Sequence, residues 1–402
     1  MKRLFGLLTI ALLIGCQEVP HRAKYVFLFI GDGMGLTQVA AAEAYLANSS
    51  GEIGSQALNF TQFPVLGTAT TYSASNWITC SSASGTALAT GTKTTNGMLG
   101  VSSDTVALKA ITYKIKEAGY KVGVSSTVTL DHATPGAFYA HAASRNDYYT
   151  IATQLPATGF DFFGGGGFIL PKGWKRDQVP VTDLIEQAGY TIAYGMDDFQ
   201  NVSSTGKLVL LQDETRDFMG ALPYAIDRKE GDMTHADIVQ AAIEFLENEK
   251  GFFLMSESGR IDWACHSNDG KTSILETLDL QNAVQVAIEF AQKHPQETLI
   301  VVTADHETGG MALGWENQYN VFLDQLNEQK ASKDILLESG DKKAGEMVAE
   351  INRRARIGWT TSAHTGVPVP VYAMGTNSEL FAGRMDNTDI PKKICEAMGV
   401  VF

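Results

Sequence analysis

Short apolar runs bounded by turn residues constrain the fold of this chain more than any other feature of its sequence. Five such runs occur, at Tyr25–Ile30, Lys121–Ser125, Gly251–Met255, Leu299–Thr303 and Pro370–Met374. Continuous apolar runs of this length are typical of strands that are buried on both faces of a parallel sheet. The sequence therefore predicts buried parallel strands at these positions.

Helical patterns lie between these runs. Apolar residues recur at three- and four-residue spacing in Ala107–Ala118, Ala236–Glu247 and Ile274–Gln292, which indicates amphipathic helices. The alternation favours a doubly wound α/β fold, with a mainly parallel central sheet and helices on both faces. Gly119 and Gly189 are each expected to end a helix just before a strand.

Two segments interrupt the alternation. Residues 319–356 are polar and charge-rich although they lie between apolar strands, so we expect residues 311–360 to form a small helical cap inserted in the core. The glycine run in Asp161–Gly167 lacks the lysine and the following serine or threonine of a phosphate-binding P-loop. We interpret it as a tight turn.

The first residues have the pattern of an export signal. A basic pair precedes an apolar run from Leu4 to Ile14, which is too short to cross a bilayer. The letters LIGC that end at Cys16 resemble the lipobox of bacterial lipoproteins, which implies a signal peptide over residues 1–15, lipidation of Cys16 and a tether over residues 16–24. We expect an exported protein of the periplasm or cell envelope, held at the membrane only by this anchor.

The net charge limits the possible binding partners, and the cysteine content limits the possible disulfides. The formal net charge of −14 disfavours nucleic acid or an anionic membrane surface as a specific partner, because both attract cationic proteins. Beyond Cys16 the chain has three cysteines, Cys80, Cys265 and Cys395, and an odd number implies no disulfide framework. The remaining residues, 25–402, are numerous enough to form one large catalytic domain.

Metal-ligand residues lie beside the ends of the predicted strands. Asp32, Glu257, Asp305 and His306 follow strands, and His364 precedes the last one. Because ligands of open α/β sheets bind beyond the carboxyl ends of the strands, we expect these side chains to meet at one edge. A dinucleotide-binding loop does not fit the first of these turns, since residue 36 is leucine where that motif needs glycine or alanine.

Asp262 and His266 are a further pair of this kind. Their four-residue spacing places both on one face if Gly259–His266 forms a helical turn. Imidazoles mixed with carboxylates suit zinc, whereas oxygen ligands alone suit magnesium. The sequence therefore indicates more than one kind of metal site at the same edge.

A hydroxyl-rich segment, Thr79–Thr86, holds the candidate nucleophiles. It contains neither histidine nor carboxylate. A serine hydroxyl is a weak nucleophile unless an adjacent base or a metal ion activates it. The activating group must therefore come from elsewhere in the fold.

Six pieces of the sequence resemble, in the same order, motifs of the alkaline phosphatase family: FIGDGMG, ITCSSASGTALATGTKTTNGMLGV, DHATPGAFYAHAASR, ESGRIDWACH, TADHETGG and AHTG. The resemblance runs from Tyr25 to near the C-terminus. It implies hydrolysis of small phosphate monoesters to alcohol and inorganic phosphate through a phosphoserine. From the family we also expect a homodimer. The resemblance also implies two zinc ions, which activate nucleophile, leaving group and water, and one magnesium ion.

The resemblance assigns roles position by position. Ser81 matches the nucleophile, and Arg145 matches the arginine that clamps phosphate. The matched ligands are Asp262, His266 and His364 for one zinc, Asp32, Asp305 and His306 for the other, and Asp32, Thr134 and Glu257 for magnesium. A serine at the start of a helix suits this role, because the free N–H groups there favour an anion.

Three positions differ from the best-studied bacterial pattern. Cys80 stands where an aspartate usually holds the clamping arginine, so we expect Arg145 to be more mobile and phosphate to bind more weakly. His132 and Trp263 occupy variable positions of the family and are expected to alter water-mediated phosphate contacts and magnesium occupancy.

Three other classes of protein share parts of this pattern. Sulfatases need a C/S-x-P-x-R motif, and the segment that starts at Cys80 has neither the proline nor the arginine. Phosphodiesterases of this superfamily generally use threonine and lack the Arg145 clamp, which makes them a more distant but open alternative. A lipoprotein that binds phosphate or metal without catalysis also stays open, because of the cysteine at position 80.

Overall fold

The computed structural model describes residues 22–203, 205–212, 220–316 and 319–402. The predicted signal peptide and the lipidation site Cys16 lie outside these residues. Within them, none of the helices has the length together with the apolar character that a membrane span requires.

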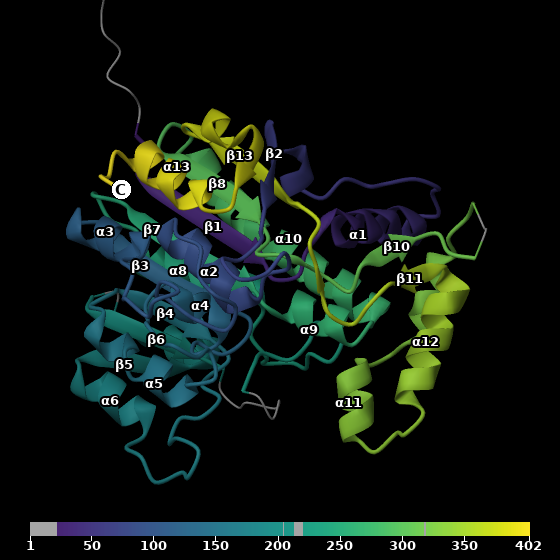
Figure 1. Ribbon diagram of the computed structural model, residues 1–402, viewed down its shortest axis with the longest axis horizontal. Helices are drawn as coiled ribbons and strands as arrows, with labels where there is room; N and C mark the ends of the chain where they lie inside the picture. Colours follow the sequence, from purple (N-terminus) through teal and green to yellow (C-terminus); the bar gives the residue numbers. More distant parts are fainter. Residues whose placement is uncertain (1–21, 204, 213–219, 317–318) are drawn as a thin grey trace, which may run out of the picture.

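A ten-stranded sheet forms the centre of the molecule, in the order β14-β2-β13-β8-β1-β7-β3-β4-β6-β5 (Figure 1). Its strands are β1 Tyr25–Gly31, β2 Val65–Thr70, β3 Lys121–Ser126, β4 Phe162–Gly165, β5 Tyr190–Tyr194, β6 Lys207–Leu211, β7 Phe252–Ser258, β8 Thr298–Thr303, β13 Val369–Gly375 and β14 Gly383–Asp386. All neighbouring pairs are parallel except the two that involve β13. The predicted mainly parallel sheet is confirmed.

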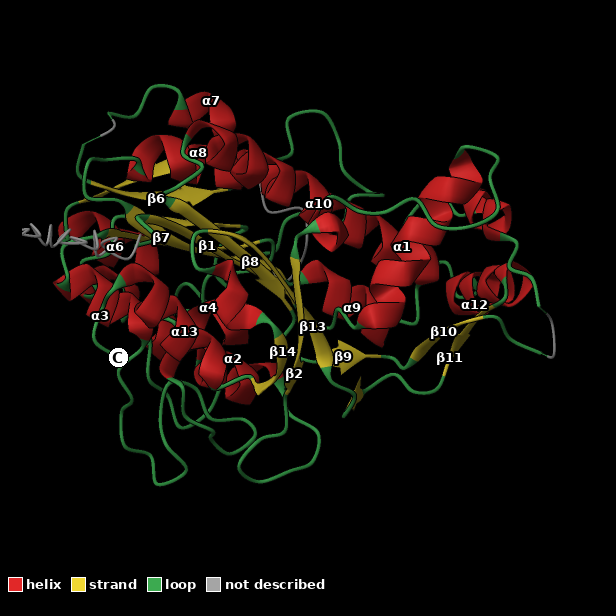
Figure 2. Ribbon diagram, turned by 90° about the horizontal axis from the view of Figure 1, so that it is seen from above, coloured by secondary structure: helices red, strands yellow, loops and turns green. Residues whose placement is uncertain are grey.

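Helices cover both faces of this sheet (Figure 2). The longer ones are α1 Leu36–Ser49, α2 Ser81–Thr90, α8 His235–Leu246, α10 Gly270–Lys293, α12 Ala344–Ala355 and α13 Asp389–Met398. The shorter ones are α3 Ile111–Glu117, α4 Ala133–Ala137, α5 Tyr148–Ala152, α6 Val181–Gln187, α7 Gly195–Phe199, α9 Arg260–His266 and α11 Lys333–Glu338. Four 3-10 turns complete the helical elements, η1 Phe60–Gln62, η2 Leu155–Ala157, η3 Leu323–Glu328 and η4 Ser378–Phe381. The central strands β1, β7 and β8 are buried along their whole length, which explains their largely apolar sequences.

The predicted helices and helix ends are largely confirmed. Helices α8 and α10 lie where the apolar spacing places them, whereas α3 begins only at Ile111, later than predicted. Gly119 and Gly189 have φ values of 89° and 81° after α3 and α6, the left-handed backbone that ends a helix.

The prediction of a parallel strand at Pro370–Met374 is wrong. Strand β13 runs antiparallel to both β8 and β2. The chain leaves β8 at the carboxyl edge, passes through residues 311–360 and returns at the same edge, where β10 (Met311–Leu313) pairs with β11 (Ile357–Trp359). A strand that starts at this edge runs opposite to β8, and an antiparallel neighbour needs no crossover helix.

The interpretation of Asp161–Gly167 as a tight turn is also wrong, because Phe162–Gly165 forms β4 inside the sheet. The glycines there make room for neighbours. A Cβ atom on Gly164 would lie 2.7 Å from Cγ2 of Ile238 in α8. Close packing of a helix on the strand, and not a change of chain direction, accounts for this glycine.

Residues 311–360 stand beside the sheet as a separate helical group (Figure 1). The paired strands β10 and β11 begin and end this segment. In the sequence, η3, α11 and α12 follow β10 and precede β11. Helix α12 buries Val348, Ile351 and Ala355 on one side and exposes charged residues on the other. The helical character predicted for this segment is observed, while its bounds as a cap and those of the catalytic domain stay predictions.

Candidate active site

Ser81 is the first residue of helix α2, whose ten residues are all buried. The next turn of the helix is fixed to the end of β8, since the Ser84 hydroxyl donates to the backbone oxygen of Asp305 at 2.7 Å. The side chain of Asn387 in turn donates to Ser84 Oγ at 2.9 Å. These bonds hold the start of α2 against the strand end that carries Asp305.

The Ser81 hydroxyl faces two groups from other elements. Its Oγ lies 3.3 Å from Nε2 of His306, and Nη1 of Arg145 donates to it at 3.4 Å. A positive guanidinium and a potential metal ligand therefore meet at the same oxygen. The structure thus brings Ser81 and Arg145 together, and their catalytic roles stay predictions.

Asp32, Asp305 and His306 form the first cluster of potential metal ligands, and their ligand atoms lie within 4.8 Å of one another. Nε2 of His306 is 3.4 Å from Asp32 Oδ1 and 3.1 Å from Asp305 Oδ2. The other oxygen of Asp305 accepts the N–H groups of Gly33, at 3.2 Å, and of His306, at 2.9 Å. One Asp305 oxygen is thus used by the fold, and the other faces the cluster.

Asp262, His266 and His364 form the second cluster. The predicted helical turn exists as α9, and Nε2 of His266 lies 3.2 Å from Asp262 Oδ2. Nε2 of His364 lies 3.7 Å from Asp262 Oδ1 and 3.1 Å from the same nitrogen of His266. The structure therefore brings the three predicted ligands together, and it also places His306 near Asp262 and His364.

Backbone oxygens orient the imidazole rings of His266 and His364. Nδ1 of His266 lies 2.6 Å from the oxygen of Ser362, and Nδ1 of His364 lies 2.9 Å from that of Thr79. A carbonyl accepts, so each Nδ1 carries the proton and each Nε2 is left as a ligand atom.

The third cluster consists of Asp32, Glu257 and His132, again with ligand atoms within 4.8 Å. Thr134 was predicted as a ligand here, and its hydroxyl oxygen is buried without a hydrogen-bond partner among the described residues. Helix α4 begins directly after His132 and carries Thr134. The structure thus places an imidazole beside a site for which only oxygen ligands were predicted.

Electrostatic repulsion is strong among the carboxylates of these clusters. Burial and the neighbouring carboxylates raise the pKa of Asp32 well above its usual range. Burial, with the nearby charge of Asp262, raises the pKa of Asp305 to about 8. Burial also raises the pKa of Glu257 to about 7, against the opposing hydrogen bond from Ser126. Cations bound between these groups would relieve the repulsion.

The residues present fit metal ions. Several buried oxygens have no hydrogen-bond partner among the described residues: both oxygens of Asp32, Oδ2 of Asp305, Oε1 of Glu257 and Oγ1 of Thr134. Buried polar atoms without partners are rare in folded proteins, and a metal ion supplies the missing partner. All three clusters mix imidazole with carboxylate, as zinc sites do, and the third also has the buried hydroxyl of Thr134 beside Glu257, which adds an oxygen of the kind that magnesium prefers.

His132 and Trp263 border the guanidinium of Arg145. Nη2 of Arg145 lies 3.2 Å from Nε2 of His132. Burial and the charge of Arg145 lower the pKa of His132 to about 3, so its imidazole is neutral and Nε2 accepts from Arg145. The Trp263 ring packs edge-on against His132 with 5.6 Å between ring centroids. Both variable positions therefore lie next to the proposed phosphate clamp.

Cys80 is half-buried at the N-cap of α2. Its sulfur accepts the N–H of Gly97 at 3.1 Å and lies 3.2 Å from the Ser82 hydroxyl. Burial raises the pKa of Cys80, but these hydrogen bonds and the charge of Arg145 outweigh it and lower the pKa below its usual value. Among the described residues Cys80, Cys265 and Cys395 are free thiols, whereas the sequence had left their pairing open.

Sequence reasoning missed residues that support the ligands. The Thr308 hydroxyl donates to Asp262 and lies 3.2 Å from Nδ1 of His306. Nε2 of Gln38 in α1 donates to Glu307 at 2.7 Å and to the oxygen of Thr308 at 2.8 Å. Thr308 lies within the TADHETGG motif, so the sequence offered a signal that could have identified it. Gln38 had none, because it is 269 residues from Glu307 in the sequence.

The doubly wound sheet and the three adjoining clusters define a metal-dependent hydrolase with a serine at the start of a helix. The alkaline phosphatase family model matches residues 23–164 and 183–400, and the chain belongs to the alkaline phosphatase family. It is therefore a phosphoric monoester hydrolase, as the sequence motifs indicated.

Individual relatives are similar to this chain over nearly its whole length. Alkaline phosphatase 3 of Bacillus subtilis is 32% identical, over 93% of this chain and 89% of the relative. A cold-active alkaline phosphatase of a psychrophilic Shewanella superposes with a TM-score of 0.82 at 30% identity, over 93% of this chain and 99% of the other. A mutant TAB5 alkaline phosphatase with Mg bound in its M3 site has a TM-score of 0.75 at 30% identity, over 95% of this chain and 100% of that one.

Proposed function

We propose that Ser81 is the residue on which this phosphomonoesterase forms its phosphoserine intermediate. The observation that carries the proposal is the contact of Ser81 Oγ with both Arg145 and His306, at 3.4 and 3.3 Å. The phosphate monoester would bind with two oxygens on the planar guanidinium of Arg145. The free N–H groups at the start of α2 would face the same phosphate and favour its negative charge.

Two zinc ions and one magnesium ion are the proposed cofactors. Asp262, His266 and His364 would hold one zinc, and Asp32, Asp305 and His306 the other. Magnesium would lie between Asp32, Thr134 and Glu257, with His132 at its border. When bound, such a pair of metals stabilises the attacking and leaving oxygens of an in-line displacement and lowers the pKa of water.

The side chains around Ser81 complete the proposed cycle. The alcohol leaves as the Ser81 oxygen bonds to phosphorus, and water then attacks the phosphoserine to release phosphate and restore the hydroxyl. Neutral His132 accepts a hydrogen bond from Arg145 and so orients the guanidinium without competing with it for phosphate. Burial of Ser81 and His306 keeps bulk water away, which strengthens the charge interactions at the site.

Chelation tests the proposed metal dependence. A soluble form that lacks residues 1–16 should hydrolyse p-nitrophenyl phosphate at alkaline pH, lose this activity with chelator and recover it with zinc and magnesium. Bis-p-nitrophenyl phosphate and p-nitrophenyl sulfate serve as controls and should be poor substrates. Cleavage of the diester alone would identify a phosphodiesterase, and failure of the metal-loaded protein on all three would favour the binding lipoprotein.

Restoring the usual aspartate tests the role of position 80. In Cys80→Asp, the new carboxylate is expected to hold Arg145 and lower the inhibition constant for inorganic phosphate by roughly threefold to tenfold. Cys80→Ser is the matched control, because it keeps the size of the side chain and adds no charge. Equal inhibition constants in the two variants would refute the proposed link between this position and the Arg145 clamp.

Export, anchoring and assembly complete the proposal. The signal pattern and the lipobox support an exported lipoprotein anchored at Cys16, which metabolic labelling with a radioactive fatty acid would detect. A homodimer is expected from the family. Leu36, Leu66 and Val367 are exposed large apolar residues, as at a subunit contact, and light scattering would measure the mass in solution.

A further inference from the structure

A cavity of about 340 Å³ lies beside α9, outside the three ligand clusters. Its walls include Pro223, Tyr224, Ile226, Ala331 and Ile335, which are mainly apolar. Three cationic side chains, Arg260, Lys229 and Lys330, and one carboxylate, Asp227, also line it. Mostly apolar walls with a few charged groups are typical of sites for small organic ligands.

Arg260 connects this cavity to the proposed active site. It is the first residue of α9 and only 3% exposed. Its guanidinium lies 3.7 Å from the centroid of the Tyr224 ring and 5.0 Å from that of Trp263. Trp263, one helical turn further on, packs against His132 next to the phosphate clamp. The contacts of the Trp263 ring with Arg260 and with His132 thus link the cavity wall to the residues beside Arg145.

Helix α9 presents the two sites on adjacent faces. Arg260 and Trp263 are three residues apart and share one face of the helix. Asp262 and His266 are four residues apart and share the neighbouring face. His266 is the most exposed of the second-cluster ligands, with 40% of its side chain accessible. A leaving group that departs past this histidine and Trp263 has the cavity as its neighbour.

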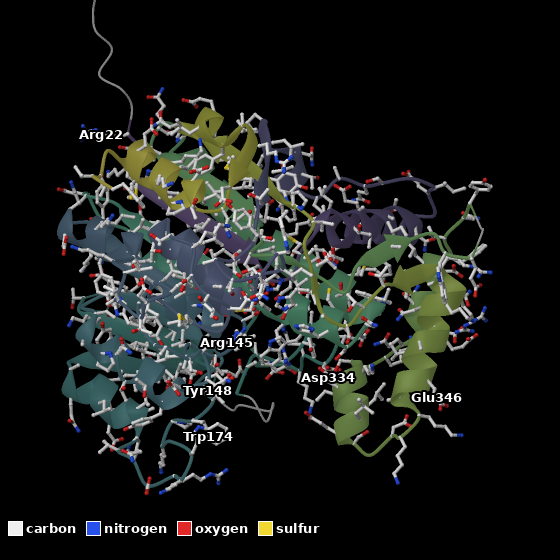
Figure 3. All side chains as sticks on the ribbon, viewed as in Figure 1. Arg22, Arg145, Tyr148, Trp174, Asp334 and Glu346 are labelled. Carbon is white, nitrogen blue, oxygen red and sulfur yellow. The ribbon has the colours of Figure 1, made fainter. Side chains whose placement is uncertain are left out.

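The inserted segment supplies and fixes the far wall. The carboxylate of Asp334 accepts the hydroxyl of Tyr224 at 2.9 Å and that of Ser267 at 2.8 Å. The N–H of Ser332 donates to Asp227 at 2.9 Å. Asp334 and Arg145 are both marked in Figure 3, one on the inserted segment and one on the core. These bonds hold the inserted segment against Tyr224 and Asp227 and so fix the shape of the cavity. They also connect it to the candidate site, because Ser267 directly follows His266.

The charge of the cavity differs from that of the chain. The protein has a formal net charge of −14, yet three cations and only one carboxylate line this cavity, and Asp227 already accepts a backbone hydrogen bond. Two more carboxylates lie behind the wall, Asp334 bonded to Tyr224 and Glu276 near Arg260, so Lys229 and Lys330 are the cations left to face a ligand. A local positive charge in an acidic protein attracts anions to that place. The apolar walls beside it favour a ligand that also has a hydrocarbon part.

We propose that this cavity is a leaving-group subsite, which favours phosphate monoesters whose alcohol carries an apolar ring and a second anionic group. The proposal rests on the phosphomonoesterase mechanism given above. The phosphate would lie at Ser81 and Arg145, the apolar part would lie along Trp263, and the second anion would lie near Lys229 and Lys330. These lysines are specificity-determining residues and take no part in the chemical step.

Two substrates of equal shape test the subsite. 4-(Carboxymethyl)phenyl phosphate carries the second anion, and 4-ethylphenyl phosphate replaces it with a methyl group. The variant Lys229→Gln/Lys330→Gln removes both exposed cations of the cavity. The matched control, Lys342→Gln/Lys343→Gln, removes two exposed cations from the inserted segment that also carries Lys330, and neither of them lines the cavity. Both variants change the net charge equally.

The metal-loaded wild-type protein is expected to prefer the carboxylate substrate in kcat/KM. The cavity variant should lose roughly fivefold to tenfold on that substrate, mainly through KM, and less than about twofold on the ethyl substrate. The control variant should keep the preference. Absence of a wild-type preference, or an equal loss in both variants, would overturn the subsite. Hydrolysis of neither substrate by the metal-loaded wild type would instead refute the proposed phosphomonoesterase mechanism.

Discussion

Ser81→Ala is expected to lower kcat for p-nitrophenyl phosphate by about a thousandfold or more, because it removes the oxygen that forms the covalent intermediate. Metal content should stay unchanged, since this variant keeps every histidine and carboxylate of the three clusters. The measurement is steady-state hydrolysis, combined with metal analysis of the purified variant. Acid quenching with radioactive substrate should trap phosphoserine on the wild-type chain and none on the variant.

Ser82→Ala is the matched control for this variant. Ser82 is also buried in the first turn of α2, but its hydroxyl lies 3.2 Å from the Cys80 sulfur. It should retain activity within about tenfold of wild type, as expected for a hydrogen bond outside the reacting groups. A Ser82→Ala variant as inactive as Ser81→Ala would show that the helix N-terminus tolerates no change. In that case trapping of phosphoserine decides the nucleophile, and a label on any residue other than Ser81 would refute the assignment.

Asp32→Ala is expected to have the largest effect on metal content. Asp32 belongs to two clusters, one with Asp305 and His306 and one with Glu257 and His132. Its loss should lower the bound metal by one zinc and one magnesium per chain, because each of two ions loses one ligand. The value of kcat should fall at least a hundredfold. Elemental analysis by mass spectrometry after dialysis against a fixed zinc and magnesium buffer measures both ions.

Asp262→Ala separates this effect from a general loss of charge. It removes one buried carboxylate as well, but from the cluster with His364 and not from the one with Glu257. We expect it to lose one zinc and keep magnesium. Loss of the same ions in both variants would contradict the proposal that Asp32 is shared between two metals.

Metal removal also provides a readout of stability. Ions that bind the folded chain and not the unfolded one raise the unfolding temperature by mass action. The wild-type unfolding temperature should therefore fall on chelation, and it should fall less in Asp32→Ala, which has fewer ions to lose. Calorimetry before and after chelation measures the difference.

Much of the candidate site was predictable because its potential metal ligands adjoin apolar strands. The carboxyl ends of parallel strands share one edge, so Asp32 after β1, Glu257 in β7 and Asp305 after β8 had to converge. The four-residue spacing of Asp262 and His266 likewise predicted their common face on α9. Local patterns were sufficient here, because backbone geometry alone determines where these side chains point.

Other features depend on contacts between segments that are distant in the sequence. The role of His132 beside Asp32 and Glu257 follows from the packing of α4 on the sheet, and the sequence offered only its place in a motif. The bond from Gln38 to Glu307 joins α1 to the ligand loop after β8 without any local pattern. A residue's neighbours along the chain do not reveal its partner across the fold.

The sequence by itself determined the α/β class, the strands β1, β3, β7 and β8, and the residues that can hold metal, because burial and strand ends leave a pattern in neighbouring residues. Only the tertiary structure decided the antiparallel direction of β13, the strand at Phe162–Gly165 and the cavity beside Arg260. An apolar run records that a strand is buried and not which way it runs. A cavity exists only where segments such as Tyr224 and Lys330 are brought together by folding.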